Sequence, residues 1–285
     1  MKHITLVMHC PDQKGIIASV TNFIHENKGN IVYIDQYVDR ENKVFFMRVE
    51  VDFSEHPDFQ LKKIETTFET TVGQKFKLDC QFYDQSKPPK MAVFVSKYDH
   101  CLYDILAQQR SGKLACTIPF ILSNHNDLAS IAEQFSIPFY HVPVMKNNKD
   151  QAELKQLELL KKYEVNCIVL ARYMQILSSK IIDHYPSKII NIHHSFLPAF
   201  PGAKPYHSAF QRGVKIIGAT SHYVTEELDA GPIIEQDIIR VSHSHEVKDF
   251  VLKGQDLERL VLLRALKLHC ERKIMTYNNK TIVFN

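Results

Sequence analysis

The chain has 285 residues, 45% of them hydrophobic, which is long enough for two ordinary domains with cores of their own. Its formal net charge of +3 gives no electrostatic reason to expect a nucleic-acid partner, and its six scattered cysteines, without C-x-x-C or zinc-finger spacing, favour buried thiols in a reducing cytosol. The N-terminus lacks the features of a signal peptide and no apolar stretch approaches the roughly 18 residues of a membrane helix, so we expect a soluble, cytoplasmic protein without membrane contact.

The first part of the chain predicts a small domain of strands and helices. An apolar run ends at Pro11, apolar residues recur at helical spacing after Gly15, and two alternating runs around a polar turn indicate a hairpin. The β-α-β-β-α-β order is that of the ferredoxin-like fold. The expected elements are strands at 4–10, 31–39, 44–53 and 75–83, and helices at 16–28 and 57–72.

This element order, together with the opening C-P-D-Q-K-G-I-I-A-S-V-T-N-F-I at 10–24, resembles an ACT domain, a regulatory module that often binds amino acids. The resemblance implies a small amino-acid effector, such as glycine or methionine, near the first strand–helix loop and the following strand. The residues that match these positions are Asp12, Gly15, Asn30 and Ile31. An alternative is a module that only assembles a homo-oligomer through sheet pairing, and Asp12 is equally well explained as a turn residue and helix cap.

A polar stretch with two consecutive prolines, D-Q-S-K-P-P-K at 84–90, separates this part from the rest. Two prolines resist both a helix and a central strand, which suits a short stiff linker. We therefore predict an ACT-like domain at 1–84, a linker at 85–90 and a second domain at 91–285.

In the second domain, short apolar runs alternate with amphipathic segments. This alternation predicts an α/β fold of Rossmann-like type, a mostly parallel sheet with helices on both faces. Ligands of such sheets bind beyond the carboxyl ends of the strands. The expected strands are 91–95, 113–122, 138–142, 167–170, 188–192, 216–224 and 232–241, and the expected helices are 101–109, 128–135, 150–163, 179–183 and 246–270.

The first strand-to-helix loop of this domain, Ser96 to Cys101, contains no glycine. Dinucleotide and Walker A loops need glycines for close approach of the backbone to phosphate, so both are excluded here. The stretch Ile189 to Phe200 is a stronger candidate for a reaction site, because Asn191 and His193 project from one face of a strand at its end. A hydrogen-bond donor and a titratable base are thereby placed side by side.

Three motifs resemble the formyltransferase family that uses 10-formyltetrahydrofolate: N-I-H-x-S-x-L-P-x-F at 191–200, G-A-T-x-H-Y-V at 218–224 and L-D-x-G-P-I-I at 228–234. The resemblance implies that Asn191, His193 and Asp229 are catalytic, that 10-formyltetrahydrofolate is the substrate, and that no cofactor or metal is required. It also implies a folate pocket, to which we assign Arg172, Tyr173, Met174, Ile176, Leu177, His222 and Thr225. A buried structural role for His222 and a solvated strand-end role for Arg172 are alternatives.

Within this family the sequence favours the hydrolytic, deformylase branch, which releases tetrahydrofolate and formate, balances the one-carbon pool and supplies formate for purine synthesis. His194 stands where the glycinamide ribonucleotide transformylases have proline, and strand geometry predicts that it points away from His193. In the expected reaction, Asn191 donates to the oxyanion while Asp229 takes the water proton and orients His193.

Three alternatives stay open. A transferase acting on an amine such as glycinamide ribonucleotide needs a glycine-rich first loop for the phosphate, which this chain lacks. A ligand sensor without chemistry has no need for all three catalytic groups. A zinc site could be imagined from His193, His194, His207, His222 and Asp229, but adjacent histidines on a strand diverge and the sequence has no H-x-x-x-H pair.

Overall fold

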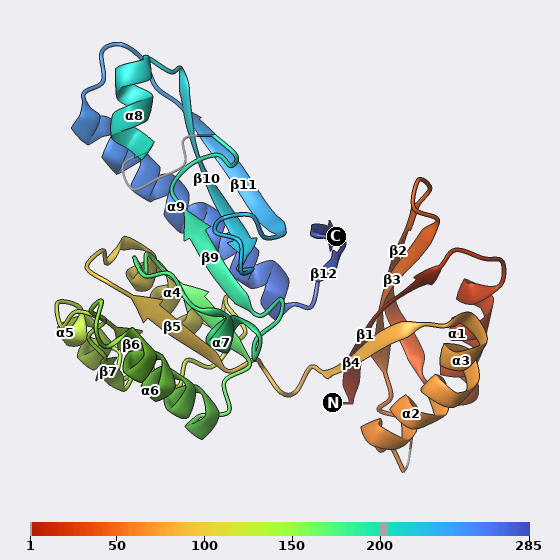
Figure 1. Ribbon diagram of the computed structural model, residues 1–285. Coiled ribbons are helices and arrows are strands. Elements are labelled where there is room, and N and C mark those ends of the chain that lie inside the picture. Colours follow the sequence, from red (N-terminus) through yellow and green to blue (C-terminus); the bar gives the residue numbers. More distant parts are fainter. Residues whose placement is uncertain (1, 57, 200–204) are drawn as a thin grey trace. The chain divides into compact units, whose positions relative to one another are not determined.

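The computed structural model describes residues 2–56, 58–199 and 205–285 and divides into two compact units (Figure 1). The first comprises Met1–Pro88, Arg272–Met275 and Val283–Asn285, and the second comprises Pro89–Glu271 and Thr276–Ile282. The predicted second domain thus gives two short C-terminal segments to the first unit. Arg48 Nε donates to the carbonyl of Arg272 at 2.9 Å, and Tyr33 Oη donates to that of Asn285 at 2.7 Å, which holds these segments on the first unit.

The first unit has the predicted ferredoxin-like order, with an antiparallel sheet in the order β2-β3-β1-β4. One face of this sheet packs against the helices around a core that includes Phe23, Phe53 and Phe68. The elements are β1 (His3–Pro11), α1 (Ile16–Glu26), β2 (Asn30–Asp39), β3 (Val44–Asp52), α2 (Leu61–Phe68), the π-helical turn η1 (Glu69–Gly73), α3 (Gln74–Phe76) and β4 (Asp79–Asp84).

The predicted start of the last strand, at Lys75, is wrong. The helical path continues through η1 and α3 as far as Phe76, because Phe68, Val72 and Phe76 follow at helical spacing and are all buried in the core. Lys77 then adopts a left-handed conformation with φ of 55°, which ends the helix and lets β4 begin at Asp79. The predicted helix start, Pro57, lies outside the described residues.

The second unit is built on a seven-stranded sheet in the order β11-β10-β9-β8-β5-β6-β7. The five neighbouring strands β9, β8, β5, β6 and β7 are parallel, as predicted, whereas β10 and β11 add an antiparallel edge. Its strands are β5 (Met91–Val95), β6 (Ile121–Ser123), β7 (Phe139–His141), β8 (Cys167–Leu170), β9 (Ile189–His193), β10 (Ile216–Tyr223) and β11 (Ile233–Arg240). A separate C-terminal hairpin of β12 (Ile274–Tyr277) and β13 (Lys280–Val283) contains residues of both units. Its helices are α4 (His100–Arg110), α5 (Ala129–Gln134), α6 (Lys149–Lys162), α7 (Ser179–Ile182), α8 (Pro205–Arg212) and α9 (Val247–Cys270).

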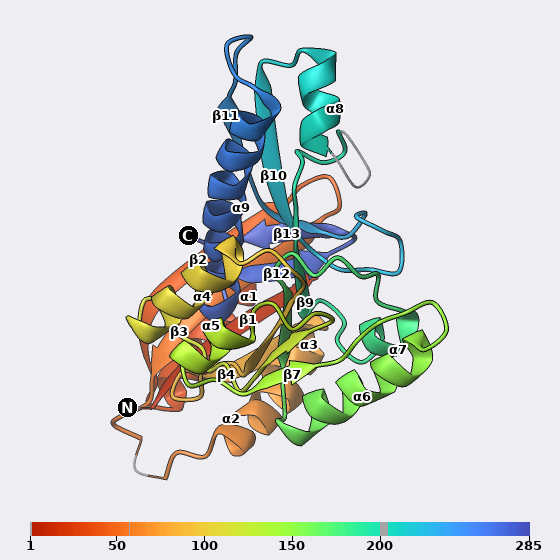
Figure 2. The same cartoon turned by 90° about the vertical axis from the view of Figure 1, so that its left-hand side faces the viewer.

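Helices cover both faces of this sheet, as predicted. Figure 2 shows α6 and α7 on one side of the sheet and α4 and α9 on the other. Residues of α6 and α7 share a buried cluster with alternate residues of the strands, such as Ala92 and Phe94. The predicted strand 113–122 shortens to β6, since Pro119 has no N–H to give to a ladder.

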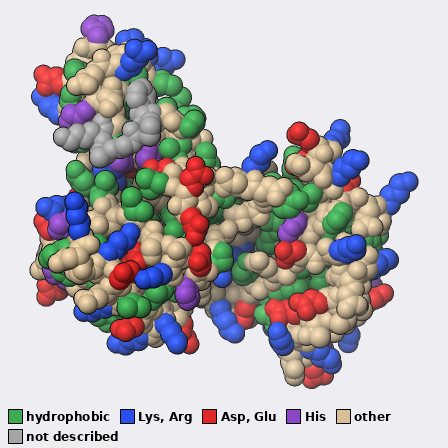
Figure 3. Space-filling view, in the orientation of Figure 1, with side chains coloured by type: hydrophobic (Ala, Val, Ile, Leu, Met, Phe, Trp, Pro, Cys, Tyr) green, Lys and Arg blue, Asp and Glu red, His purple; other side chains and the backbone are tan. Residues whose placement is uncertain are grey.

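The strand ends that matter for function lie level with one another. In the parallel ladder Leu170 of β8 pairs with Asn191 of β9, and Phe94 of β5 pairs with Leu170. The loops after β5, β8 and β9 therefore leave the sheet at the same edge, which is where α/β proteins bind ligands. None of the helices in the described parts of the chain combines the length and apolarity needed to span a bilayer. Basic and acidic side chains are interspersed over the visible face (Figure 3).

Candidate active site

A cavity of about 300 Å³ opens at the carboxyl ends of β8 and β9. Its walls come from three segments that are distant in the sequence: the loop after β8, the end of β9, and the loop between β10 and β11. It is lined by Leu170, Arg172, Tyr173, Met174, Gln175, Ile176, Leu177, Ile182, Asn191, Ile192, His193, His194, His222, Val224, Thr225, Glu226, Leu228 and Asp229.

The three residues predicted to be catalytic meet in this cavity. His193 Nδ1 lies 3.2 Å from Asp229 Oδ2, although 36 positions separate the two residues in the sequence. His222 is paired with Asn191 across the ladder between β10 and β9. Its Nε2 lies between Asn191 and Asp229, 3.2 Å from Asn191 Nδ2 and 3.6 Å from Asp229 Oδ1. The predicted trio is therefore part of a cluster of four polar side chains.

The hydrogen bonds of His222 determine what Asn191 can offer to a ligand. His222 Nδ1 lies 2.9 Å from the carbonyl oxygen of Tyr223, which can only accept, so Nδ1 carries a hydrogen. Nε2 accepts from the amide of Asn191, whose nitrogen can only donate. One amide hydrogen of Asn191 is used in this way, and the second is available to the cavity.

Asp229 is held as a carboxylate. The hydrogen bond from His193 keeps its pKa well below the usual range of a carboxyl group, and it outweighs the opposing effect of partial burial. Its backbone is left-handed, with φ of 56°, a conformation that aspartate tolerates better than most residues. Gly231 makes this loop possible, because a Cβ there would lie 1.8 Å from the carbonyl oxygen of Tyr223.

The motif on β10 supports the loop that follows His193. Thr220 Oγ1 donates to the carbonyl of Ser195 at 2.9 Å and accepts from the backbone N–H of Leu197 at 3.0 Å. Gly218 gives room for the side chain of Phe196, whose Cβ would be 2.7 Å from an added Cβ. The last residue of the first motif, Phe200, lies outside the described residues.

All seven residues predicted to contact folate line the same cavity: Arg172, Tyr173, Met174, Ile176, Leu177, His222 and Thr225. Tyr173 is buried, and its hydroxyl receives a hydrogen bond from Gln156 at 3.1 Å. Met174 and Ile176 expose large apolar side chains, with 44% and 60% of their surface accessible. The structure thus gathers the predicted folate residues in one place, and their role in binding stays a prediction.

His194 does not point away from His193, as strand geometry had predicted. The two rings lie side by side, with centroids 5.3 Å apart and planes inclined by 35°. The reason is that β9 ends at His193, so the alternation of side chains does not extend to the next residue. His194 instead packs against the ring of Tyr206, with centroids 6.0 Å apart.

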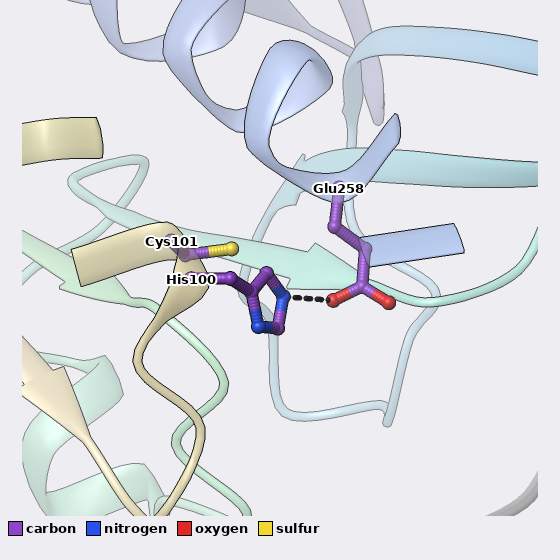
Figure 4. Close-up of side chains that lie close together, drawn as sticks. All are labelled: His100, Cys101 and Glu258. Atoms are coloured by element: carbon purple, nitrogen blue, oxygen red, sulfur yellow. Dashed lines mark hydrogen bonds and ion pairs between the residues drawn. The ribbon is translucent and has the colours of Figure 1, made fainter. Parts of the chain in front are cut away.

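The sequence did not reveal a buried carboxylate beside the cavity. Glu258 of α9 is fully buried, and its carboxylate lies 2.8 Å from His100 Nε2 (Figure 4). The same carboxylate lies 3.5 Å from Arg172 Nε and accepts a 2.6 Å hydrogen bond from Tyr206. Burial alone would raise the pKa of Glu258, but these partners lower it overall. The available signal was a glutamate among the apolar positions of a long amphipathic helix.

Among the described residues, the group with spacing suited to a metal ion is His100, Cys101 and Glu258 (Figure 4). The carboxylate in this group is already paired with Arg172 and Tyr206. Burial and the nearby carboxylate also raise the pKa of the Cys101 thiol well above its ordinary value, which favours the protonated form over the thiolate that binds metals. These neighbours make the group a poor set of metal ligands.

The four residues predicted to bind an effector do not form one cluster in a single copy of the chain. Asn30 and Ile31 begin β2 and lie near the His3 end of β1, because Asn30 and His3 both pair with Asp52. Asp12 and Gly15 follow the other end of β1, whose nine residues span about 26 Å at 3.3 Å per step. Gly15 has a φ of 92° just before α1, so its conformation requires glycine.

Comparison with known proteins agrees with both units. The ACT domain family matches residues 4–58, and the formyl transferase family matches residues 89–266. A formyltetrahydrofolate deformylase of Synechocystis sp. is 50% identical over 98% of both chains, and that of Bacillus subtilis is 44% identical over 98% of this chain and 93% of its own.

Solved structures give the same result. A formyltetrahydrofolate deformylase from Pseudomonas syringae superimposes with a TM-score of 0.96 at 44% identity, covering 100% of this chain and 95% of its own. A glycinamide ribonucleotide transformylase from Symbiobacterium toebii covers 71% of this chain and 97% of its own, with a TM-score of 0.67 at 26% identity. An α/β sheet with amide, imidazole and carboxylate groups around a strand-end cavity is typical of a small-molecule enzyme. The chain belongs to the formyl transferase family and, within it, to the formyltetrahydrofolate deformylases.

Proposed function

We propose that this protein hydrolyses 10-formyltetrahydrofolate to tetrahydrofolate and formate. Membership of the deformylase family supports the reaction, and the observation that carries it is the cluster of Asn191, His193, His222 and Asp229 in a 300 Å³ cavity. This cluster offers a hydrogen-bond donor, a base and an ionised carboxylate within one site.

Asn191 is assigned to the oxyanion. When water adds to the formyl carbon, the carbonyl oxygen gains negative charge, and the second amide hydrogen of Asn191 is available to stabilise it. The bond to His222 fixes the amide in place before the reaction, so little reorganisation is needed as charge develops. One such donor typically contributes about 10²–10³ in rate.

Asp229 and His193 are assigned to proton transfer. Asp229 is ionised at neutral pH and takes the proton of the attacking water, a step to which a positioned base contributes about 10²–10⁴. His193 uses Nδ1 towards Asp229, while its buried Nε2 has no hydrogen-bond partner among the described residues. That nitrogen is therefore available to take the hydroxyl proton of the tetrahedral intermediate and to pass it to the departing N10 of the folate.

Water rather than an amine is proposed as the acceptor. The loop after β5 has no glycine and is tied down by Ser96, whose hydroxyl donates to Asn124 Oδ1 at 2.6 Å and accepts from the N–H of Met174 at 3.1 Å. This loop cannot close around a phosphate as a glycine-rich loop does.

The test is to incubate the purified protein with 10-formyltetrahydrofolate and no amine. Release of formate at a rate proportional to enzyme supports hydrolysis. Turnover that appears only with glycinamide ribonucleotide identifies a transferase, and binding without turnover in both conditions identifies a sensor. The same assay after exhaustive treatment with EDTA should show unchanged turnover, because the proposed groups act without a metal.

We also propose that the ACT unit takes part in assembly and in binding a small amino acid. Its edge strand β2 exposes Val32, Ile34 and Tyr37, an unusual set of apolar side chains for a strand with one unpaired edge. Within one copy of the chain, Asp12 and Asn30 lie at opposite ends of β1. An effector that contacts both residues therefore needs two copies of the chain. Light scattering and formate-release assays with glycine and methionine test this, and a monomer with unchanged kinetics would contradict it.

A further inference from the structure

Arg172 occupies an unusual position for a cation. Its side chain is only 9% exposed, it lines the cavity that contains Asn191 and His193, and its Nε and Nη1 have no hydrogen-bond partner among the described residues. A buried charged donor without a hydrogen bond is unfavourable. Donors in this state at the wall of a cavity are suited to an anionic ligand.

Two contacts hold the guanidinium in this place. Its Nε lies 3.5 Å from the carboxylate of Glu258, and its central carbon lies 4.8 Å from the ring centre of Tyr98. The backbone of Arg172 is left-handed, with φ of 62°, which turns the chain directly after β8. Glu258 is fixed in turn by His100 and by Tyr206, whose ring lies against Gly254, where a Cβ would be 2.1 Å away.

The position of Arg172 relative to the catalytic groups follows from the strand register. Leu170 pairs with Asn191 in the parallel ladder between β8 and β9. Arg172 is two residues after Leu170 and His193 is two residues after Asn191, so both leave the sheet at the same level from neighbouring strands. Arg172 and the catalytic cluster line the same cavity.

Hydrolysis and transfer differ in the charge of their products. In hydrolysis a water oxygen bonds to the formyl carbon, the bond from that carbon to N10 breaks, N10 takes one proton, and formate leaves as an anion with release of a second proton. In transfer to an amine the product is a neutral amide. We infer that Arg172 binds the carboxylate of the formate product, an anion that transfer to an amine does not create. The inference rests on the proposed function.

The experiment measures binding of sodium [¹³C]formate to the unreacted protein with tetrahydrofolate present, by NMR line broadening, with sodium chloride at equal ionic strength as the control. Three variants are compared with the wild type. The double variant Arg172→Gln with Glu258→Gln removes both charges together, Glu258→Gln removes only the competing carboxylate, and Lys97→Gln removes an exposed cation in the neighbouring loop.

Each variant has a distinct expected result. The double variant should bind formate about 10- to 100-fold more weakly, the factor expected for loss of a hydrogen bond to a charged group. Glu258→Gln should bind formate at least as tightly as the wild type, because the guanidinium then has no internal carboxylate beside it. Lys97→Gln should match the wild type. If Glu258→Gln unfolds, the charge-neutral double variant still tests the inference, with thermal unfolding as the check on its fold.

Two outcomes would overturn the inference. One is formate binding by the double variant that equals that of the wild type. The other is an unchanged affinity for formate with a tenfold higher KM for 10-formyltetrahydrofolate, which would place Arg172 on the folate. Because formate binding needs no turnover, this result is independent of the amine-free assay, and a failure of the proposed function would be recognised separately.

Discussion

The catalytic cavity and the ACT unit differ in whether the fold brings their predicted site residues together. His193 and Asp229 are 36 positions apart and lie 3.2 Å from each other. Asp12 and Asn30 are only 18 positions apart, and the full length of β1 separates them. Closeness in sequence is therefore no guide to the shared site in either unit.

The direction of the chain explains this difference. Arg172 and His193 lie at or beyond the ends of the parallel strands β8 and β9, which meet at one edge of the sheet. The antiparallel pairing of β10 with β9 then brings His222, and the loop that carries Asp229, to the same cavity. In the first unit, Asp12 follows the end of β1 whereas Asn30 begins β2, and β1 and β2 run in the same direction because both are antiparallel to β3. A loop after one strand and the start of the next strand then lie at opposite ends.

Removal of the Asp229 carboxylate should have the largest effect on the cavity. We expect Asp229→Asn to lower kcat by about 10²–10⁴, the contribution of a positioned base. Formate release under saturating 10-formyltetrahydrofolate measures this change. Glu227→Gln, two residues earlier and exposed in the same loop, is the control and should keep normal turnover. Near-normal activity in Asp229→Asn would contradict the assigned mechanism.

Removal of the amide of Asn191 should come next. We expect Asn191→Ala to lower kcat by about 10²–10³ with little change in KM, because the donor acts on charge that develops only during the reaction. Steady-state kinetics separate the two constants. A rise in KM with unchanged kcat would show that Asn191 binds the ground state of the substrate and is not an oxyanion donor.

The loop that carries Asp229 depends on a glycine. Gly231→Ala should destabilise the protein by about 3 kcal/mol, because its Cβ meets the backbone oxygen of Tyr223 at 1.8 Å and overpacking against backbone is costly. Denaturant unfolding measures the loss. Gly73→Ala is the matched control, since Gly73 has a helical conformation and the nearest atom to its added Cβ is 3.4 Å away. Equal stability of the two variants would contradict the proposed strain.

Asp229 should also link stability to pH. Its pKa is depressed in the folded protein, so the carboxylate contributes stability above its unfolded pKa of about 3.9, and this contribution is lost as the pH falls below that value. The difference in free energy of unfolding between the wild type and Asp229→Asn should be full at pH 7 and shrink below about pH 4. A constant difference across this range would show that Asp229 has no special pairing in the folded state.

The smallest effects should come from the residues that the ACT unit keeps apart. Asp12→Ala and Asn30→Ala should be additive in unfolding free energy within about 0.5 kcal/mol, as for sites without shared contacts. Unfolding of both single variants and the double variant under dilute conditions measures this. A coupling well above 1 kcal/mol would show contact between the two positions, either within one copy or across an assembly. The two residues could then belong to one effector site.

Most of the catalytic cluster could be predicted from the sequence, because short-range patterns encode it. The two-residue spacing of Asn191 and His193 places them on one face of any strand, and the strand-end position of Arg172 through Leu177 places these residues beside them. The motif around Asp229 added the third group only through its resemblance to a family. The order of elements in both units likewise follows from local periodicity and turn residues.

Other features were decided only by tertiary structure, because they depend on contacts between segments with no local signature. The antiparallel pairing of β10 with β9 brings His222 between Asn191 and Asp229, and the end of β9 at His193 turns His194 back towards its neighbour. The packing of α9 on the sheet carries Glu258 to Arg172, 86 positions earlier in the chain. No spacing rule links such residues, because what joins them is the path of the chain through space.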